Sequence, residues 1–427
     1  MTVYAHQITP DPVFGAGISR VGKSICRQSN GRLWVVATLD DANRTLRAFY
    51  SDDGGQTWSV DADLGINTKE PCICVDGQDV LHVAWATYDV TPRSVLHRRR
   101  TSAGWQPVET IESGSYYDPE RVMLAVDAND VVHCLYYWYP NATRDEMKYC
   151  RRNGSWGAPE VVYGYDGYCH PGGIVIDDEG NVHSSSKVPA SGNVRYWVRD
   201  AATGNWSFES VGNIPGTWWY SQVMLDENGY PHIIVDYTAY QEGQGCYCEF
   251  RWDGASWQAH MDIWGGTGGF SVGAYAGDTP ITLAIRIRSS YYLVLLYKNP
   301  PYTGGWGAED SLSVAVTQVN QLYARFPIVS GARTNQPETG FAGIYRAQAD
   351  SSLWYFTTDD LAWPVGETEY QTMVGGPLSW DWKKCRYEGE EKCPRGSPVS
   401  WDWAAPVAGG PEQTPQGGPT GFVWGSE

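Results

Sequence analysis

The sequence has little positive charge and no long apolar run. Its 31 Lys and Arg side chains are outnumbered by 49 Asp and Glu, which gives a net charge of −18 at pH 7. A field of this sign repels phosphate backbones, so we expect no nucleic-acid partner. No stretch approaches the roughly 20 apolar residues of a membrane-spanning helix, and residues 1–18 lack the basic and apolar regions of a secretory leader. We therefore expect no membrane insertion and no signal peptide.

The ten cysteines lack the spacing of a structural metal site. Cys72 and Cys74 are separated by one residue, as are Cys246 and Cys248, whereas zinc knuckles use the C-x-x-C spacing. A thiol inside a strand packs as a small apolar group. We therefore expect neither a metal nor a cofactor.

Two other cysteine pairs are candidates for disulfides. Cys134 and Cys150 lie opposite each other if residues 131–152 form a hairpin, and Cys385 and Cys393 bracket a short loop. The sequence leaves the oxidation state of both pairs open.

Charged residues are also scarce, at 19%, which disfavours an ordinary helical protein rich in Lys and Glu. In their place stand 21 Trp, 28 Tyr and 48 Gly. Aromatic residues favour strands and glycines favour tight turns, so this composition predicts many short strands.

One motif recurs four times: an Asp, five further residues, and a His. Apolar stretches flank each copy, and the residues between Asp and His are turn formers, as in VDANDVVH and IDDEGNVH. Each copy therefore predicts a strand, a tight turn and a returning strand. The pairs are Asp76 and His82, Asp127 and His133, Asp177 and His183, and Asp226 and His232.

A second marker, a Gly-rich turn running into Trp, recurs about every fifty residues, as a repeat architecture requires. Two further strand-like stretches lie between His and Trp, so each repeat predicts four antiparallel strands. Sheets of this kind, arranged radially, cover one another's faces. The sequence thus predicts an all-β, seven-bladed β-propeller over residues 1–372, with an extended tail over 373–427. The markers are Trp58, Trp105, Trp156, Trp206, Trp257, Trp306 and Trp363, and the expected blades are 20–63, 70–111, 120–163, 171–212, 220–263, 269–310 and 324–370.

The repeated histidines and tryptophans are best interpreted as structural. Each His directly follows a turn, and Trp34 occupies the same slot in the first repeat. A side chain reused in every blade most simply serves packing and hydrogen bonding. The marker tryptophans are expected in the core between blades.

Residues 51–58 read SDDGGQTW and match the Asp box, S-x-D-x-G-x-T-W, at every defined position. On this motif and the repeat, the chain resembles sialidase-like propellers of the bacterial-neuraminidase repeat (BNR) family across about residues 20–370. The resemblance implies a structural turn on the blade rim. Its residues are Ser51, Asp53, Gly55, Thr57 and Trp58.

The sialidase resemblance also implies three arginines that bind the substrate carboxylate. Arg20, Arg121 and Arg325 each stand at the start of an expected innermost strand, and three guanidinium groups would form a carboxylate clamp. No Tyr–Glu pair can be singled out for the nucleophile, so sialidase chemistry is an alternative only.

Propeller polysaccharide lyases provide a second enzymatic alternative. They need a cation against the uronate carboxylate and a base for the C5 proton. His170 in YDGYCHPGG precedes an innermost strand, and with Tyr168 and Arg121 it forms a candidate catalytic set. The competing interpretation of His170 is a loop residue that caps a strand.

The loops expected at one face are rich in aromatic rings flanked by carboxylates. Such a surface suits sugars, whose C–H faces stack on rings, and also suits a protein partner. We expect Tyr116, Tyr117, Trp218, Trp219 and Tyr220, with Arg20 and Arg325, to bind a glycan. The full set of loop residues is Lys69, Glu70, Tyr88, Tyr116, Tyr117, Asp118, Glu120, Trp138, Tyr139, Tyr168, His170, Trp218, Trp219, Tyr220, Tyr237, Tyr240, Tyr291, Tyr292 and Arg325.

The tail repeats PLSWDW as PVSWDW within a Pro- and Gly-rich context. Its spaced tryptophans fit two interpretations equally: attachment to a protein partner, or packing back onto the underside of the propeller. A leaderless acidic propeller with an anchoring tail indicates a glycan-recognising head of a virion tail or capsid, which contacts host polysaccharide. A cytoplasmic location is the alternative. A carbohydrate-active enzyme and a purely structural assembly subunit are the alternative functions, and whether any bond is cleaved stays open.

Overall fold

The computed structural model divides the chain into two units, Met1–Val365 and Gly366–Glu427. All described residues belong to the first unit, so the predicted tail, with Cys385 and Cys393, lies outside them. The described residues are 4–14, 22–165, 171–188, 192–214, 217–226, 228–238, 245–264, 270–273, 281–287, 292–298, 310–312, 342–346 and 351–357.

Every regular element in these residues is a β-strand, and the strands form seven sheets. All recorded pairings are antiparallel, as expected for strands joined by short turns. The first three sheets contain β2 (Ile25–Arg27), β3 (Leu33–Thr38), β4 (Leu46–Ser51) and β5 (Ser59–Gly65); β6 (Thr68–Val75), β7 (Leu81–Thr87), β8 (Arg93–Thr101), β9 (Gly104–Trp105) and β10 (Glu109–Ser115); and β11 (Glu120–Val126), β12 (Val132–Trp138), β13 (Asp145–Asn153), β14 (Ser155–Trp156) and β15 (Glu160–Tyr165). The next three contain β16 (Pro171–Ile176), β17 (Val182–Val188), β18 (Asn193–Arg199) and β19 (Trp206–Asn213); β20 (Thr217–Leu225), β21 (Pro231–Thr238), β22 (Gly245–Trp252) and β23 (Trp257–Trp264); and β24 (Phe270–Gly273), β25 (Ile281–Ile287), β26 (Tyr292–Lys298) and β27 (Asp310–Leu312).

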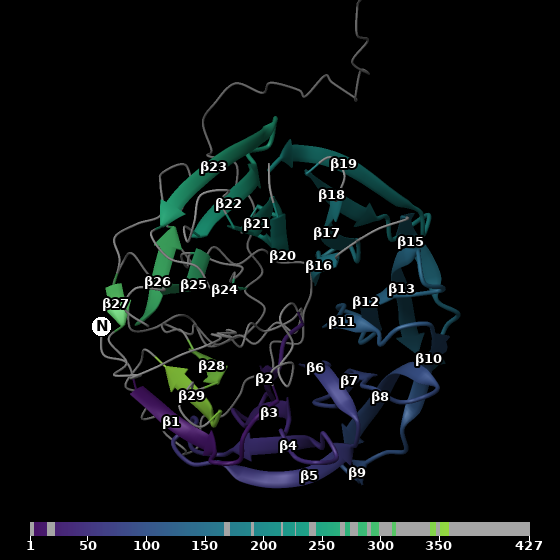
Figure 1. The fold of residues 1–427 in the computed structure, drawn as a ribbon, viewed down its shortest axis with the longest axis vertical. Helices are drawn as coiled ribbons and strands as arrows, with labels where there is room; N and C mark the ends of the chain where they lie inside the picture. Colours follow the sequence, from purple (N-terminus) through teal and green to yellow (C-terminus); the bar gives the residue numbers. More distant parts are fainter. Residues whose placement is uncertain are drawn as a thin grey trace, which may run out of the picture. The chain divides into compact units, whose positions relative to one another are not determined.

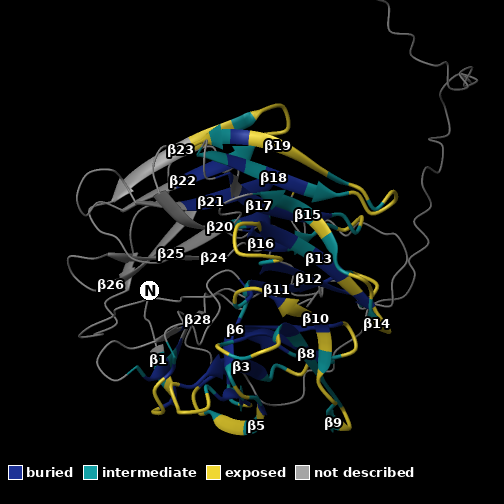
Figure 2. Ribbon diagram, turned by 45° about the vertical axis from the view of Figure 1, so that its right-hand side comes forward, coloured by how far each residue is buried: buried dark blue, intermediate teal, exposed yellow. Residues whose placement is uncertain are grey.

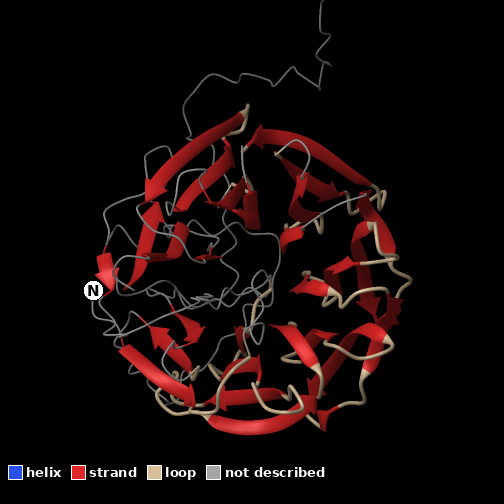
Figure 3. Cartoon of the chain, viewed as in Figure 1, coloured by secondary structure: helices blue, strands red, loops and turns tan. Residues whose placement is uncertain are grey.

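Figure 1 shows these sheets side by side around one centre, with β6, β11, β16 and β20 innermost and β5, β19 and β23 outermost. Figure 3 shows the same ring of strands joined by loops. The predicted all-β propeller of antiparallel sheets is confirmed. In the described part of the chain, four sheets have the expected four strands, whereas the second and third have five and the last has three. The blade number of seven stays a prediction, because residues 313–341 lie outside the described part of the chain.

The seventh sheet differs from the expected seventh repeat, which was assigned to residues 324–370 alone. It contains β28 (Ala342–Arg346) and β29 (Leu353–Thr357), and β29 pairs with β1 (Tyr4–Thr9) from the other end of the chain. The prediction gave the N-terminal residues no strand and was wrong there. A repeat search misses β1 because the segment carries neither the Asp–His motif nor the Trp marker.

The core lies between neighbouring sheets, and Figure 2 shows burial concentrated on the inner strands. Every side chain of β7 and β12 is buried. One cluster between the second and third sheets contains Cys72, Cys74, Cys134 and Cys150. Cys134 and Cys150 are directly opposite, as the hairpin prediction required, and both are free thiols. Burial, together with the Cys150 neighbour, raises the pKa of the Cys134 thiol, which keeps it neutral.

The Asp–His motif fastens the turn between the first two strands of a sheet. Asp127 Oδ1 accepts the Val131 N–H at 2.9 Å, and its Oδ2 lies 3.3 Å from His133 Nε2. The other ring nitrogen, Nδ1, lies 2.6 Å from the Tyr149 hydroxyl on the third strand. One carboxylate therefore holds a turn and orients a buried His that bridges to the next strand. The same contacts recur at Asp76 with His82, Asp177 with His183, and Asp226 with His232.

The first sheet has the corresponding contact between the turn and the second strand, but different residues make it. Trp34 occupies the His slot, and its Nε1 donates to Gln28 Oε1 at 2.7 Å. Gln28 lies six residues earlier, where the second to fifth sheets have Asp. The structural interpretation of the repeated slot therefore holds for the first sheet too.

The segment Ser51–Trp58 forms a compact turn at the same end of the blade. Ser51 Oγ accepts the Gly55 N–H at 2.8 Å, Asp53 accepts the N–H and hydroxyl of Thr57, and Trp58 Nε1 donates to Gly55 O. Gly55 has φ +93°, and a Cβ there would collide with the Tyr355 ring, so only glycine fits. These bonds join turn residues to one another and leave the segment a structural role.

The five marker tryptophans within the described residues pack against the core clusters, whereas Trp306 and Trp363 lie outside the described part of the chain. Trp206 of the fourth sheet lies 5.4 Å, centroid to centroid, from Tyr149 of the third, and its Nε1 donates to Glu160 of the third at 3.0 Å. Arg199 binds the same carboxylate at 2.9 Å. The seam between the third and fourth sheets thus combines ring packing with charge-assisted bonds.

Candidate functional site

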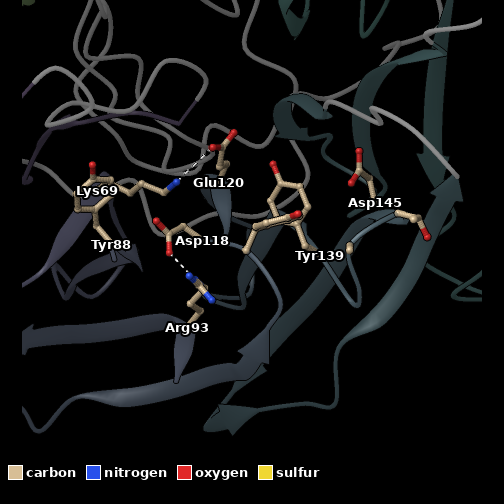
Figure 4. A pocket seen from close by; sticks show the side chains of 10 residues that line it. Lys69, Tyr88, Arg93, Asp118, Glu120, Tyr139 and Asp145 are labelled. Atoms are coloured by element: carbon tan, nitrogen blue, oxygen red, sulfur yellow. Dashed lines mark hydrogen bonds and ion pairs between the residues drawn. The ribbon is translucent and has the colours of Figure 1, made fainter. Parts of the chain in front are cut away.

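A cavity of about 710 Å³ lies between the second and third sheets, at the opposite end of their hairpins from the Asp–His turns. It is bounded by the start of β6, the β7–β8 connection, the start of β11 and the β12–β13 connection (Figure 4). Its lining residues are Lys69, Tyr88, Arg93, Tyr117, Asp118, Glu120, Tyr139, Ala142, Thr143 and Asp145. We call this end of the blades the cavity end and the other the turn end.

Backbone irregularities at the starts of β6 and β11 aim two of these side chains. The β6–β7 register shifts between Lys69 and Cys72, and the β11–β12 register shifts between Glu120 and Met123. At each shift one residue has a positive φ, +49° at Glu70 and +54° at Arg121. A bulge re-aims neighbouring side chains, and here Lys69 and Glu120 both face the cavity.

The cationic side chains of the lining are held by carboxylates. Lys69 Nζ lies 3.2 Å from Glu120 Oε1, which links the two sheets. Arg93 Nε donates to Asp118 Oδ1 at 2.8 Å, and its Nη1 donates to the Tyr116 carbonyl at 2.8 Å. These pairs fix polar groups in place before any ligand arrives.

Tyrosine rings form one wall. Tyr117 packs edge-on against both Tyr116, at 4.8 Å between centroids, and Tyr139, at 5.5 Å. Tyr116 and Tyr117 are about half exposed, at 51% and 47%. Burial, with Glu120 and Asp145 nearby, raises the pKa of the Tyr139 hydroxyl, which therefore remains a neutral donor.

Asp145 is the most enclosed carboxylate of the lining, with 8% of the residue exposed. The Tyr137 hydroxyl donates to its Oδ2. Burial raises the pKa of Asp145, and the Glu120 charge adds to this, against the opposing effect of the Tyr137 bond. Burial is thus the main reason that the charged form of Asp145 is disfavoured.

The structure brings together some of the predicted site residues. Tyr117 lines the cavity, and Tyr116 packs on it. The Arg121 side chain is buried, at 4% exposure, and its Nη1 donates to Pro171 O at 3.4 Å, so it braces the third sheet against the fourth. Its backbone N–H donates to Glu70 Oε2.

The remaining predicted residues cannot be placed in the cavity. Trp218, Trp219 and Tyr220 belong to β20, with side chains outside the described set. Arg20, Tyr168, His170 and Arg325 also lie outside it.

In a propeller blade, the loop that enters the first strand and the loop that joins the second and third strands lie at the same end. The expectation that these loops share one face gave six of the lining residues. They are Lys69, Tyr88, Tyr117, Asp118, Glu120 and Tyr139. It missed Ala142 and Thr143 of the β12–β13 connection. It also missed two charged residues, Arg93 and Asp145, which are the first residues of the third strands β8 and β13. Extending the same expectation by one position, from the loop into the strand that follows it, would have found both.

Among the described residues, no group of three or more His, Cys, Asp or Glu side chains is arranged to hold a metal ion. None of the described elements is a helix of the length and apolarity that crossing a membrane requires. The cavity's chemistry therefore consists of tyrosine rings, fixed ion pairs and one enclosed carboxylate.

No known protein-family profile matches the sequence, and no curated protein matches it. Similarity appears at the level of structure. A polysaccharide lyase described as a PL25 ulvan lyase matches with a TM-score of 0.57 at 11% identity, over 82% of this chain and 94% of that one. The same type of enzyme bound to -[GlcA(1-4)Rha3S]- matches with a TM-score of 0.54 at 12% identity, over 82% and 94%. The polysaccharide lyase Uly1 matches with a TM-score of 0.53 at 8% identity, over 83% and 98%. These likenesses establish a shared fold.

Proposed function

We propose that this protein binds carbohydrate in the cavity between the β6–β10 and β11–β15 sheets. The observation that carries the proposal is the convergence of Tyr88, Tyr117 and Tyr139 with fixed polar side chains around one cavity of about 710 Å³. A volume of this order accommodates a few sugar rings or a drug-sized ligand.

The two kinds of lining group match the two kinds of sugar surface. Tyrosine rings provide flat apolar faces for C–H groups, and their hydroxyls also donate hydrogen bonds. The ion-paired carboxylates Asp118 and Glu120 are held at one oxygen each by Arg93 and Lys69, so lone pairs remain for sugar hydroxyls. Half-exposed Tyr116 and Tyr117 extend this surface beyond the cavity.

A carbohydrate-active enzyme is the second candidate function. The solved structures of similar fold are described as polysaccharide lyases, and one holds a uronate-containing ligand. In this chain, the enclosed Asp145 with its raised pKa has the character of a proton donor, which favours glycoside hydrolysis over β-elimination. The lyase set of His170, Tyr168 and Arg121 is less favoured, because the Arg121 guanidinium is buried against the Pro171 carbonyl.

For the biological setting we propose a virion tail or capsid appendage that contacts host glycans, with residues 373–427 attaching it to a protein partner. This proposal is supported by the net charge of −18 and by the repeated Trp-containing segments of the tail, PLSWDW and PVSWDW. A subunit with a purely structural role is the alternative, and the glycan assay separates the two.

The test is retention of the purified protein on a panel of acidic and neutral polysaccharides, with absorbance near 232 nm and reducing ends followed in parallel. We expect retention that Tyr117→Ala abolishes and Phe208→Ala preserves, because Phe208 is an equally exposed ring, at 49%, on β19. New reducing ends that Asp145→Asn abolishes would establish hydrolysis, and new absorbance would establish a lyase. Absence of both retention and product would overturn the proposal in favour of the structural subunit.

A further inference from the structure

The described cavity lining contains more acid than base. Lys69 and Arg93 are its cations, and Asp118, Glu120 and Asp145 are its carboxylates. A ligand that carries its own negative charge would therefore enter a cavity whose described side chains already have an excess of one negative charge.

Neither cation of the described lining is free to receive an anionic sugar. Lys69 pairs with Glu120 at 3.2 Å, and Arg93 pairs with Asp118 at 2.8 Å. Only 8% of the Lys69 side chain is exposed, so turning it to a ligand would leave Glu120 without its cation at the cavity wall. Separating a partly buried pair in this way is costly, and a carboxylate or sulfate on the ligand would have to offset that cost.

Asp145 is the one carboxylate of the described lining with no cation in ion-pair contact. Its recorded side-chain partner is the neutral Tyr137 hydroxyl, and the neighbouring Arg144 guanidinium binds Glu146 instead, at 3.0 Å. Figure 4 shows Asp145 at the cavity wall across from Tyr139. The raised pKa of Asp145 agrees with this placement, since a nearby cation would lower it.

We propose that the cavity selects sugars without carboxylate or sulfate groups and binds those with a basic amino group most tightly, Asp145 receiving the ammonium group. This inference rests on the proposed carbohydrate-binding function and adds the class of ligand. An ammonium group supplies the cation that Asp145 lacks and leaves both existing ion pairs intact.

The test measures binding of three soluble β-1,4- or α-1,4-linked oligomers of equal length by calorimetry: glucosamine, N-acetylglucosamine and galacturonate. The measurement is made at a pH where the glucosamine amine is protonated and at two salt concentrations. We expect the order glucosamine, then N-acetylglucosamine, with galacturonate weakest. Asp145→Asn should weaken glucosamine binding about tenfold and should weaken N-acetylglucosamine binding much less, since it removes one charge from the site.

Two controls separate this site from the general attraction of an acidic protein for cations. Asp63→Asn on β5 removes the same unit of charge at an exposed position paired with Arg47, and should leave glucosamine binding unchanged. Asp145→Asn retains an acceptor for the Tyr137 hydroxyl, and an unchanged unfolding transition would show that the variant is folded.

Tighter binding of galacturonate than of either other oligomer, or equal loss in the Asp145 and Asp63 variants, would overturn the charge selection while leaving carbohydrate binding in place. Binding of none of the three, with no retention in the polysaccharide panel, would overturn the proposed function itself.

Discussion

The two ends of the same hairpins are built on different principles. At the turn end, the second to fifth sheets repeat one arrangement, in which an Asp holds a turn and a buried His bridges to the third strand. At the cavity end, the equivalent positions differ from sheet to sheet, as Lys69 of β6 and Glu120 of β11 show. The repeated contacts at the turn end thus stabilise the fold, whereas the side chains at the cavity end differ from one sheet to the next.

The two ends also differ in how the fold shifts the pKa of their carboxylates. Hydrogen bonds from His133 and from the Val131 and Asn129 N–H groups outweigh the effect of burial and lower the pKa of Asp127. At the cavity end, burial dominates and raises the pKa of Asp145. A carboxylate stabilised by the fold serves structure, whereas one that the fold leaves short of partners is available to a ligand.

The largest expected effect is loss of stability when a turn-end carboxylate is removed. Asp127→Ala leaves two backbone N–H groups and the buried His133 without their acceptor, so the free energy of unfolding should fall by about 3 to 4 kcal/mol. Asp52→Ala removes an exposed carboxylate that pairs with Arg32 at the same end, and should cost less than about 1 kcal/mol. Denaturant unfolding measures both, and equal losses would contradict the role assigned to the motif.

The next largest expected effect is a pH dependence of the free energy of unfolding, which arises in the second sheet. His97, the partner of His82, is fully buried, and burial lowers its pKa from 6.5 to about 4, against the raising effect of Glu109. The unfolded chain therefore takes up a proton near pH 6.5 and the folded one does not. Stability is full above pH 6.5 and falls as the pH drops toward 4, by up to about 3 kcal/mol.

His97→Tyr should remove this slope, because Tyr149 and Tyr196 fill the equivalent position in the next two sheets. The reverse change, Tyr149→His, should add a slope in the third sheet. Unfolding free energies between pH 4 and 7 decide the matter, and an unchanged slope in His97→Tyr would assign the acid sensitivity to other groups.

A smaller loss of stability is expected when a hydrogen bond between neighbouring sheets is removed. Trp206→Phe removes the Nε1 bond to Glu160, whereas Trp156→Phe removes an Nε1 that is buried without a partner among the described residues. Both changes delete the same ring atoms, so their difference isolates the hydrogen bond. We expect Trp206→Phe to cost about 1 kcal/mol more than Trp156→Phe. No difference would assign the seam to ring packing alone.

The contrast between the ends also explains what the sequence could predict. Because the turn end repeats, the spacing of Asp76 to His82 and its copies located the sheets to within a few residues. The strand β1 was missed because its partner, β29, lies at the other end of the described chain. The bulges at Glu70 and Arg121 lie between neighbouring strands and were missed because no residue pattern in the sequence marks them. The strand order of a propeller blade correctly predicted that Lys69, Tyr117 and Glu120 lie close together. The spacing of residues in the sequence could not predict that the Arg121 side chain points toward the Pro171 carbonyl.

The smallest expected effect comes from the same substitution, Asp to Asn, made at both ends. We expect the free energy of unfolding to change in opposite directions. Asp127→Asn neutralises a carboxylate whose pKa the fold lowers, so stability at pH 7 should fall. Asp145→Asn neutralises one whose pKa the fold raises, so stability at pH 7 should stay within about 0.5 kcal/mol of the parent or exceed it. Because the raised pKa favours the protonated form in the folded protein, the parent gains stability from Asp145 as the pH falls from 7 toward 4, and the Asn variant should lack this gain. Paired unfolding curves of the two variants measure the signs directly. A loss at Asp145 equal to that at Asp127 would show that the cavity end is as much a structural element as the turn end, and would remove the basis for treating Asp145 as a group held ready for a ligand.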